Sequence, residues 1–173
     1  MQIPCSPYKR IIKKFNTLAK QYTKIKVINN STVEKVERLE HDYNNLENEE
    51  IVFNEYQKPY LLSEKVYFNI SHSKSAIAII ISDSECGIDI EYTDYNKKLK
   101  CLNRILNSKE QEEYNNSDDK VLYFYKQWTI KEAYFKYLGT GIKLKYIQLN
   151  IENKNIKTEE ITLNNEKYVV SYL

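Results

Sequence analysis

Residues 76–91, AIAIIISDSECGIDIE, carry the two patterns that decide the fold. Residues 76–81 are apolar throughout, which is typical of a central strand buried on both faces. Residues 87–91 alternate instead, so a strand there places Asp89 and Glu91 on one face and two isoleucines on the other. The sequence therefore predicts two successive strands, the second of which presents acidic side chains.

On either side of this stretch, the hydrophobic spacing predicts a mixture of helices and strands. Helices are expected at residues 6–22, after residues 30–31, at 98–106, from 108, and from 117–119 to 138. Strands are expected at residues 51–53, 66–70, 144–151, 160–163 and 168–173, with a turn at 57–59. Ser108 and Gln111 have the spacing of a capping box, and Gly139 supplies a stop for the last helix. The irregular alternation indicates an α+β fold.

The composition excludes several classes of protein. The chain has 173 residues and 42% hydrophobic content, which suits one domain with a buried core. Its 26 Lys and Arg nearly balance 24 Asp and Glu, which argues against a nucleic-acid partner. Three cysteines without CxxC spacing indicate reduced thiols rather than a zinc site or disulfides. The longest apolar run is strand-sized and residues 1–20 lack the apolar segment of a signal peptide, so we expect a cytoplasmic protein without membrane contact.

Asp89 and Glu91 would repel each other on one strand face unless they are exposed or neutralised. Carboxylate oxygens on a rigid strand suit Mg²⁺, which completes its coordination with phosphates and water. The alternative is an amphipathic edge strand whose acidic side chains are solvated. The spacing alone leaves both interpretations open.

A second candidate group lies in the predicted helix that ends near residue 138. Trp128, Glu132 and Lys136 are spaced four residues apart and share one stripe of that helix. Glu132 could supply a third carboxylate or a general base, and Lys136 could neutralise phosphate charge. The alternative is an ordinary Glu–Lys pair on the helix surface.

A third candidate lies where residues 68–73, FNISHS, end a predicted strand. Ser71 and His72 stand there among small polar residues, a setting that favours contact with a phosphate group. A lone histidine also commonly has a purely structural role, so this interpretation stays open on its own.

The three segments together are far more specific than any one of them. FNISHS at 68–73, GIDIE at 87–91 and WTIKEAYFKYLGTG at 128–141 occur in an order and spacing that resembles the 4′-phosphopantetheinyl transferase superfamily, in particular its Sfp-type branch. Residues 54–60, NEYQKPY, are similar to the GKP-like turn that precedes the histidine in that family. The resemblance extends over about residues 50–150.

The resemblance implies roles for individual residues. Asp89, Glu91 and Glu132 would bind Mg²⁺ together with the pyrophosphate of coenzyme A. Glu132 would also serve as the base for the carrier serine, and Lys136 would steady or protonate the leaving phosphate. The remaining implied contacts are with coenzyme A: His72 and Ser71 with a phosphate, Lys58 along the nucleotide, and Lys131 and Lys136 with the pyrophosphate.

The resemblance also implies a fold and a reaction. The fold would be a pseudo-dimer of two similar α+β lobes, residues 1–73 and 74–173, with coenzyme A in the cleft between them. The expected enzyme is a monomer that transfers 4′-phosphopantetheine to a serine of an acyl or peptidyl carrier protein and releases adenosine 3′,5′-bisphosphate. The alternative is a catalytically silent scaffold that binds a carrier protein or coenzyme A, since residues 20–45 lack the Leu-Gly-rich helix common in the family.

Overall fold

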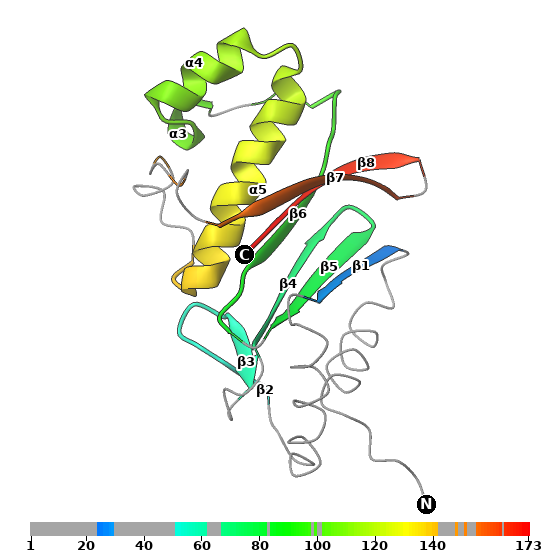
Figure 1. Cartoon of the computed structure of the whole chain (residues 1–173), viewed down its shortest axis with the longest axis vertical. Coiled ribbons are helices and arrows are strands. Elements are labelled where there is room, and N and C mark those ends of the chain that lie inside the picture. Colours follow the sequence, from blue (N-terminus) through cyan, green and yellow to red (C-terminus); the bar gives the residue numbers. More distant parts are fainter. Residues whose placement is uncertain are drawn as a thin grey trace, which may run out of the picture.

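The computed structural model describes residues 24–29, 51–61, 67–82, 84–97, 99, 102–141, 148, 151, 155–163 and 165–173. Its strands are β1 Lys24–Asn29, β2 Ile51–Phe53, β3 Pro59–Leu61, β4 Tyr67–Ser73, β5 Ala76–Ser82, β6 Ile88–Tyr92, β7 Lys157–Leu163 and β8 Glu166–Tyr172. Its helices are α3 Leu102–Ile105, α4 Ser108–Asn116 and α5 Lys120–Leu138. The predicted α+β class is confirmed (Figure 1).

The predicted apolar strand is the centre of the first sheet. That sheet has the order β1-β5-β4, with β1 parallel and β4 antiparallel to β5. Every residue of β5 is buried, as its uninterrupted apolar sequence predicts. A two-residue turn containing Lys74, whose φ is 53°, joins β4 to β5. The strands β2 and β3 form a separate hairpin joined by residues 54–58, which only partly overlap the turn predicted at 57–59.

The acidic strand belongs to a second sheet, with the order β6-β8-β7 and antiparallel pairs throughout. The alternating side chains of β6 and β8 point to the two faces of this sheet, and each face packs against a different part of the molecule. Ile88 and Ile90 join a buried cluster with Ala78 and Ile80 of β5. On the other face, Val169 of β8 packs in a cluster with side chains of α3 and α5. The two cores lie on opposite sides of the second sheet.

The long helix α5 begins and ends where its capping residues predict. Asp119 accepts a hydrogen bond from the backbone nitrogen of Leu122 at 2.9 Å, which satisfies one of the free donors of the first turn. Gly139 has a left-handed φ of 63° and its nitrogen donates to the carbonyl of Lys136, which ends the helix. Between these caps the helix buries Phe124 and Phe135 against the second sheet.

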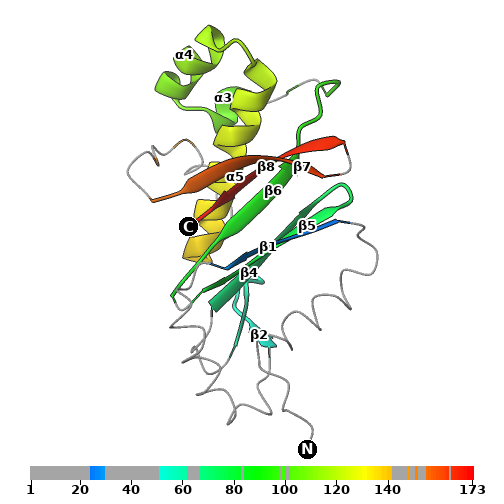
Figure 2. The same cartoon turned by 45° about the vertical axis from the view of Figure 1, so that its right-hand side comes forward.

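Figures 1 and 2 show the two sheets side by side, with β4 next to β6 and α5 along one face of the second sheet. Side chains of β4, rather than a backbone ladder, bridge the two strands: Asn69, Ser71 and Ser73 accept hydrogen bonds from backbone nitrogens of β6. The predicted boundary between residues 73 and 74 falls in the β4–β5 turn, and the division into two lobes stays a prediction.

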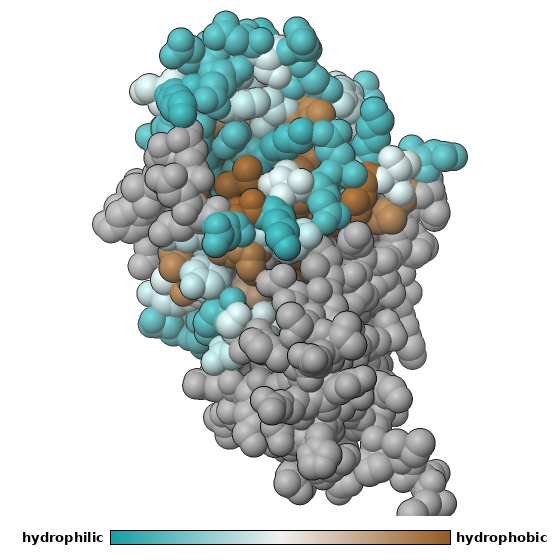
Figure 3. Space-filling model, in the orientation of Figure 1, coloured by the Kyte–Doolittle hydropathy of each residue, from teal (hydrophilic) through white to brown (hydrophobic). Residues whose placement is uncertain are grey.

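The surface of the described residues changes from the region of α4 toward the middle of the molecule. Figure 3 shows a mainly hydrophilic upper part, over α4, and hydrophobic side chains gathered below it. This agrees with the sequence of α4, SKEQEEYNN, of which only Glu110 is buried. Within the part of the chain that the structure covers, none of the helices combines the length and apolar character needed to cross a membrane.

One expectation needs correction, and three others lie wholly or mostly outside the described residues. The capping box of α4 is formed by Asn107 and Glu110, not by Ser108 and Gln111: Asn107 Oδ1 accepts from the nitrogen of Glu110, and a Glu110 carboxylate oxygen accepts from the nitrogen of Asn107. The prediction was one residue late because both pairs have the required spacing. The helices expected at 6–22 and after 31, and most of the strand expected at 144–151, fall outside the described residues.

Candidate active site

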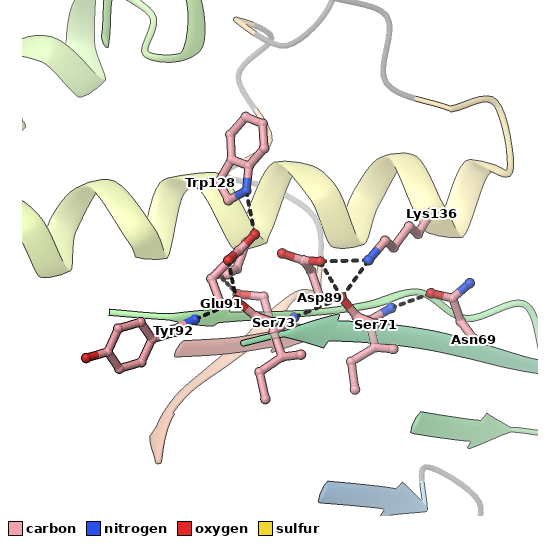
Figure 4. A network of polar contacts seen from close by, with 12 residues as sticks. Asn69, Ser71, Ser73, Asp89, Glu91, Tyr92, Trp128 and Lys136 are labelled. Atoms are coloured by element: carbon pink, nitrogen blue, oxygen red, sulfur yellow. Dashed lines mark hydrogen bonds and ion pairs between the residues drawn. The ribbon is translucent and has the colours of Figure 1, made fainter. Parts of the chain in front are cut away.

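The acidic side chains of β6 point toward α5, where Trp128 and Lys136 reach down to them from one stripe of the helix (Figure 4). Asp89 lies opposite Lys136, and Glu91 lies opposite Trp128. The strand alternation predicted from GIDIE therefore has a physical consequence, since it aims both carboxylates away from the isoleucine core and into one polar layer.

Asp89 is buried, with 3% of its surface exposed. Its Oδ1 accepts hydrogen bonds from Ser71 Oγ at 2.7 Å and from Lys136 Nζ at 2.7 Å. Burial raises the pKa of this carboxyl, and the charge of Lys136 and its hydrogen bond act in the opposite direction. Lys136 thus offsets part of the cost of burying the charge.

Glu91 is half-buried and both of its oxygens are held. Oε2 accepts from Ser73 Oγ at 2.7 Å, and Oε1 accepts from the indole Nε1 of Trp128 at 3.2 Å. Burial raises the pKa of Glu91, opposed by the Ser73 hydrogen bond, while the charge of Asp89 raises it further. The two carboxylates of β6 therefore interact, as their spacing predicts.

Glu132 lies on the same stripe of α5, one turn from Trp128 and one turn from Lys136. Burial raises its pKa to about 7, with further increases from the charges of Asp89 and Glu91 and an opposing effect from Lys136. The structure thus brings together the three predicted acidic residues and Lys136. A carboxyl group with a pKa near neutrality can both hold and release a proton under physiological conditions.

Two serines of β4 repeat one arrangement along β6. Ser71 Oγ accepts from the nitrogen of Ile90 at 3.3 Å and donates to Asp89; Ser73 Oγ accepts from the nitrogen of Tyr92 at 3.0 Å and donates to Glu91. Each serine therefore holds one carboxylate and the backbone nitrogen of the next residue. Lys136 Nζ also donates to Ser71 Oγ at 2.7 Å, so this hydroxyl uses its proton and both lone pairs within the cluster. In this arrangement the Ser71 side chain supports Asp89 rather than a phosphate.

The other predicted contacts lie around this cluster. His72 alternates with the two serines along β4, so its exposed side chain leaves the strand on the opposite face. Lys58 lies at the C-terminal end of α5, where its ammonium donates to the carbonyl of Tyr137 at 3.0 Å and pairs with Glu85 at 2.6 Å. Neither residue is part of the carboxylate group.

Lys131 does not face the carboxylate group, where the family resemblance would place it against the pyrophosphate. Its side chain is fully buried, and Nζ donates to a Glu110 carboxylate oxygen and to the carbonyl of Ile105, both at 2.6 Å. Burial lowers the pKa of the Lys131 ammonium, and the Glu110 contact raises it. The prediction was wrong because one residue along a helix turns a side chain by 100°, away from the face of Glu132.

The donor set fits a hard divalent cation. Asp89 Oδ2 is buried and lacks a hydrogen-bond partner among the described residues, and Figure 4 shows it on the side of Asp89 that faces Glu91. A buried acceptor of this kind needs a donor or a cation, and Mg²⁺ prefers carboxylate oxygens. The described His, Cys, Asp and Glu side chains do not form a ready-made group of three ligands. In this structure the carboxylates are held by side-chain donors, namely Lys136 on Asp89 and Ser73 and Trp128 on Glu91.

Two cavities lie along α5, and one of them shares residues with the cluster. One, of about 640 Å³, shares Glu91 and Trp128 with it and is otherwise mostly apolar. Its other lining residues are Lys97, Leu99, Ile105, Phe124 and Tyr125. The second, of about 240 Å³, includes Lys58 and Gly139 in its wall, together with Asn54, Pro59, Tyr60, Tyr67, Phe68, Glu85, Tyr137 and Leu138. The first cavity therefore offers space for a ligand beside Glu91, and the second lies at the C-terminal end of α5.

Sequence reasoning missed Ser73 and the hydrogen bond from Trp128 to Glu91. A signal for Ser73 was present, because Asn69, Ser71 and Ser73 are polar at every second position of a strand, which places them on one face. The sequence carried no comparable signal for the Trp128 contact, which depends on how α5 crosses β6.

Comparisons with known proteins agree with the family resemblance found in the sequence. Residues 85–173 match the family model described as the 4′-phosphopantetheinyl transferase superfamily. The chain is 33% identical over 134 residues to the 4′-phosphopantetheinyl transferase gsp of Aneurinibacillus migulanus, covering 74% of this chain and 55% of that protein. It is 32% identical over 93 residues to the 4′-phosphopantetheinyl transferase Sfp of Bacillus subtilis, covering 52% and 41%.

A shorter relative is matched almost completely. The chain is 34% identical over 112 residues to the holo-[acyl-carrier-protein] synthase of Ehrlichia chaffeensis, covering 50% of this chain and 91% of that protein. The chain thus spans about half the length of the two transferases and nearly the whole of the synthase.

Proposed function

The chain belongs to the 4′-phosphopantetheinyl transferase superfamily, and from that premise we propose that it transfers the 4′-phosphopantetheine group of coenzyme A to a serine of an acyl or peptidyl carrier protein. The observation that carries the proposal is the group formed by Asp89, Glu91 and Glu132 with Lys136 beside it. Phosphoryl transfer depends mainly on positioning and charge neutralisation, and these four side chains supply charges of both signs.

We infer that Asp89, Glu91 and Glu132 hold Mg²⁺ together with the pyrophosphate. When bound, the ion would neutralise phosphate charge and act as a Lewis acid. The Oδ2 atom of Asp89, which has no hydrogen-bond partner among the described residues, supports this inference. Lys136 would then contribute its charge to the phosphate groups, because its ammonium lies at the edge of the same cluster.

In the proposed reaction the serine oxygen of the carrier protein attacks the β-phosphorus of coenzyme A. The bond from that phosphorus to the bridging oxygen breaks, and adenosine 3′,5′-bisphosphate leaves. Glu132 would accept the serine proton directly or through a water molecule. Lys136 would stabilise the negative charge that develops on the leaving phosphate.

The cavities support an orientation for coenzyme A. The larger, mostly apolar one adjoins Glu91 and Trp128 and has room for the pantetheine arm. The smaller one includes Lys58 and lies near the end of α5, which favours the nucleotide there. His72, exposed on the far face of β4, would contact a phosphate that extends past the strand edge.

The test is a priming assay. Purified protein, an apo carrier protein, coenzyme A and Mg²⁺ are incubated, and mass spectrometry detects the phosphopantetheine adduct on the carrier. We expect the adduct with the native protein and at least a 100-fold slower reaction with Asp89→Ala or Glu132→Ala. Glu112→Gln is the control, since Glu112 is exposed on α4 and lines neither the carboxylate group nor the two cavities. Binding of coenzyme A without any adduct on several carrier proteins would refute the transferase and favour a silent scaffold.

A further inference from the structure

Glu91 differs from the other acidic residues of the cluster in that each of its oxygens has its own hydrogen-bond donor. One donor, Ser73 Oγ, comes from β4, and the other, Trp128 Nε1, comes from α5. Figure 4 shows the carboxylate between them, with the indole above it and the serine below it. Two donors from two different elements leave a carboxylate little rotational freedom.

The direction of the Ser73 hydrogen bond follows from its partners. The backbone nitrogen of Tyr92 can only donate, so it occupies a lone pair of Ser73 Oγ. The hydroxyl proton is then directed at Glu91 Oε2, 2.7 Å away, and an ionised carboxylate can only accept it. The indole nitrogen of Trp128 is likewise only a donor. Both contacts therefore favour the ionised form of Glu91, the form that a cation requires.

The neighbouring residues show that joining β4 to β6 does not require a contact with a carboxylate. Asn69 Oδ1 accepts a hydrogen bond from the backbone nitrogen of Ile88 at 3.1 Å, just as Ser73 Oγ accepts one from the backbone nitrogen of Tyr92. Asn69 has no acidic side chain beside it to hold, because the residue before Ile88, at the position equivalent to Asp89 and Glu91, is Gly87. Strand joining and carboxylate holding are thus separable in this chain.

We propose that Ser73 and Trp128 are positioning residues that fix the Glu91 carboxylate in the orientation in which it receives a divalent cation. The proposal rests on the proposed function for its cation. Groups that hold metal ligands by hydrogen bonds typically change metal affinity by 10- to 100-fold when they are removed. A hydroxyl from β4 and an indole from α5 would make the affinity depend on both elements.

The experiment measures cation binding and does not need turnover. Mn²⁺ is titrated into the protein in the presence of coenzyme A, and free Mn²⁺ is followed by electron paramagnetic resonance. We expect Ser73→Ala and Trp128→Phe each to weaken Mn²⁺ binding about tenfold. Ser73→Thr keeps the hydroxyl and should bind within about twofold of the native protein. Asn69→Ala removes a strand-joining contact without touching a carboxylate and should also stay within about twofold.

The native tryptophan gives a second readout, because Trp128 is the only tryptophan of the chain. Mn²⁺ should change its fluorescence in the native protein and in Ser73→Thr, and the change should need a higher Mn²⁺ concentration in Ser73→Ala. Circular dichroism establishes that each variant is folded before titration.

The outcomes separate this proposal from the transferase. Unchanged Mn²⁺ affinity in folded Ser73→Ala and Trp128→Phe would overturn the positioning role, even if phosphopantetheine transfer is observed. Equal losses in Asn69→Ala and Ser73→Ala would overturn it too, because strand joining alone would then explain the effect. Selective losses in a protein that transfers nothing would uphold the positioning role and refute the transferase. No Mn²⁺ binding by the native protein would overturn both the metal site and the positioning role.

Discussion

Lys136 Nζ lies 2.7 Å from Asp89 Oδ1, and this ion pair connects the last turns of α5 to the strand β6. The Asp89 side chain is 4% exposed and that of Lys136 is 28% exposed. Removing one partner of a buried pair leaves a buried charge that nothing offsets, which costs more than the pair itself contributes. The ion pair therefore matters most when no other cation is present.

We expect Lys136→Met to lower the free energy of unfolding by about 2 kcal/mol in EDTA, less than for a fully buried pair because Lys136 is partly exposed. Urea denaturation at pH 7 measures it. The double variant Lys136→Met/Asp89→Asn should be more stable than Lys136→Met alone, since no buried charge remains. Simple additivity of the two single changes would contradict the ion pair.

The raised pKa of the Glu132 carboxyl group should make the stability of the protein depend on pH. Its pKa is about 7 in the folded protein, against an ordinary value of 4.5, so the folded state binds the proton more tightly than the unfolded state. The contribution of this proton to stability is fully present below about pH 4.5 and is lost as the pH rises through 7. Glu132→Gln, which stays neutral, should therefore stabilise the metal-free protein more at pH 8 than at pH 5.

Urea denaturation of both proteins in EDTA at the two pH values checks this. Mg²⁺ provides the matched control, because a cation that binds ionised Glu132 should stabilise the native protein at pH 8 and have less effect on Glu132→Gln. The same stability difference between the two proteins at pH 5 and pH 8 would show that the Glu132 pKa is not raised.

The sequence could predict the elements whose signals are local. The apolar run of β5, the alternation of β6 and the two caps of α5 each depend on residues close together in the chain. Alternation on the strand likewise places Asp89 and Glu91 on one face, and four-residue spacing places Glu132 and Lys136 on one stripe of the helix. These features needed no knowledge of how the elements pack. The meeting of Glu132 with the two strand carboxylates was implied only by the family resemblance, because it depends on how α5 packs on β6.

Lys131 shows what the sequence could not provide. It precedes Glu132 directly, and only the packing of α3 and α4 decides that its face of α5 is buried. The same partner explains the shifted capping box, because Glu110 both caps α4 and pairs with Lys131. A spacing rule accepts Ser108 with Gln111 equally well, and the buried ammonium favours the carboxylate.

This buried pair yields a third prediction. The side chains of Lys131 and Glu110 are 1% and 9% exposed, so Lys131→Met should destabilise the protein by about 3 kcal/mol by leaving Glu110 without its cation. Lys131→Met/Glu110→Gln should lose less than the sum of the two single variants. Urea denaturation of all four proteins completes the double-mutant cycle. Strictly additive losses would indicate that the two groups do not interact.

The chain has three glycines, and their surroundings predict how much stability each would lose on substitution by alanine. A Cβ at Gly87 would lie 2.2 Å from the carbonyl oxygen of Ala133 and 2.5 Å from the backbone nitrogen of Tyr137. These are backbone atoms of a helix and cannot move aside separately, so Gly87→Ala must push α5 away from the start of β6. We expect a loss of about 3 kcal/mol, at the upper end for an overpacked site.

Substitution of the other two glycines by alanine should lower the stability less than Gly87→Ala does, and more at Gly139 than at Gly141. Gly139 has a φ of 63°, and its Cβ would lie 3.1 Å from side-chain atoms of Asn54 and Lys58, so Gly139→Ala carries a backbone cost of about 1 kcal/mol plus some crowding. Gly141 has a similar φ of 62° but meets only Tyr56 at 3.7 Å, so Gly141→Ala carries the backbone cost alone. Thermal unfolding of the three variants should rank the losses as Gly87, Gly139, Gly141. A loss at Gly87 no larger than at Gly141 would contradict the close approach of α5 to β6, on which the position of Lys136 over Asp89 depends.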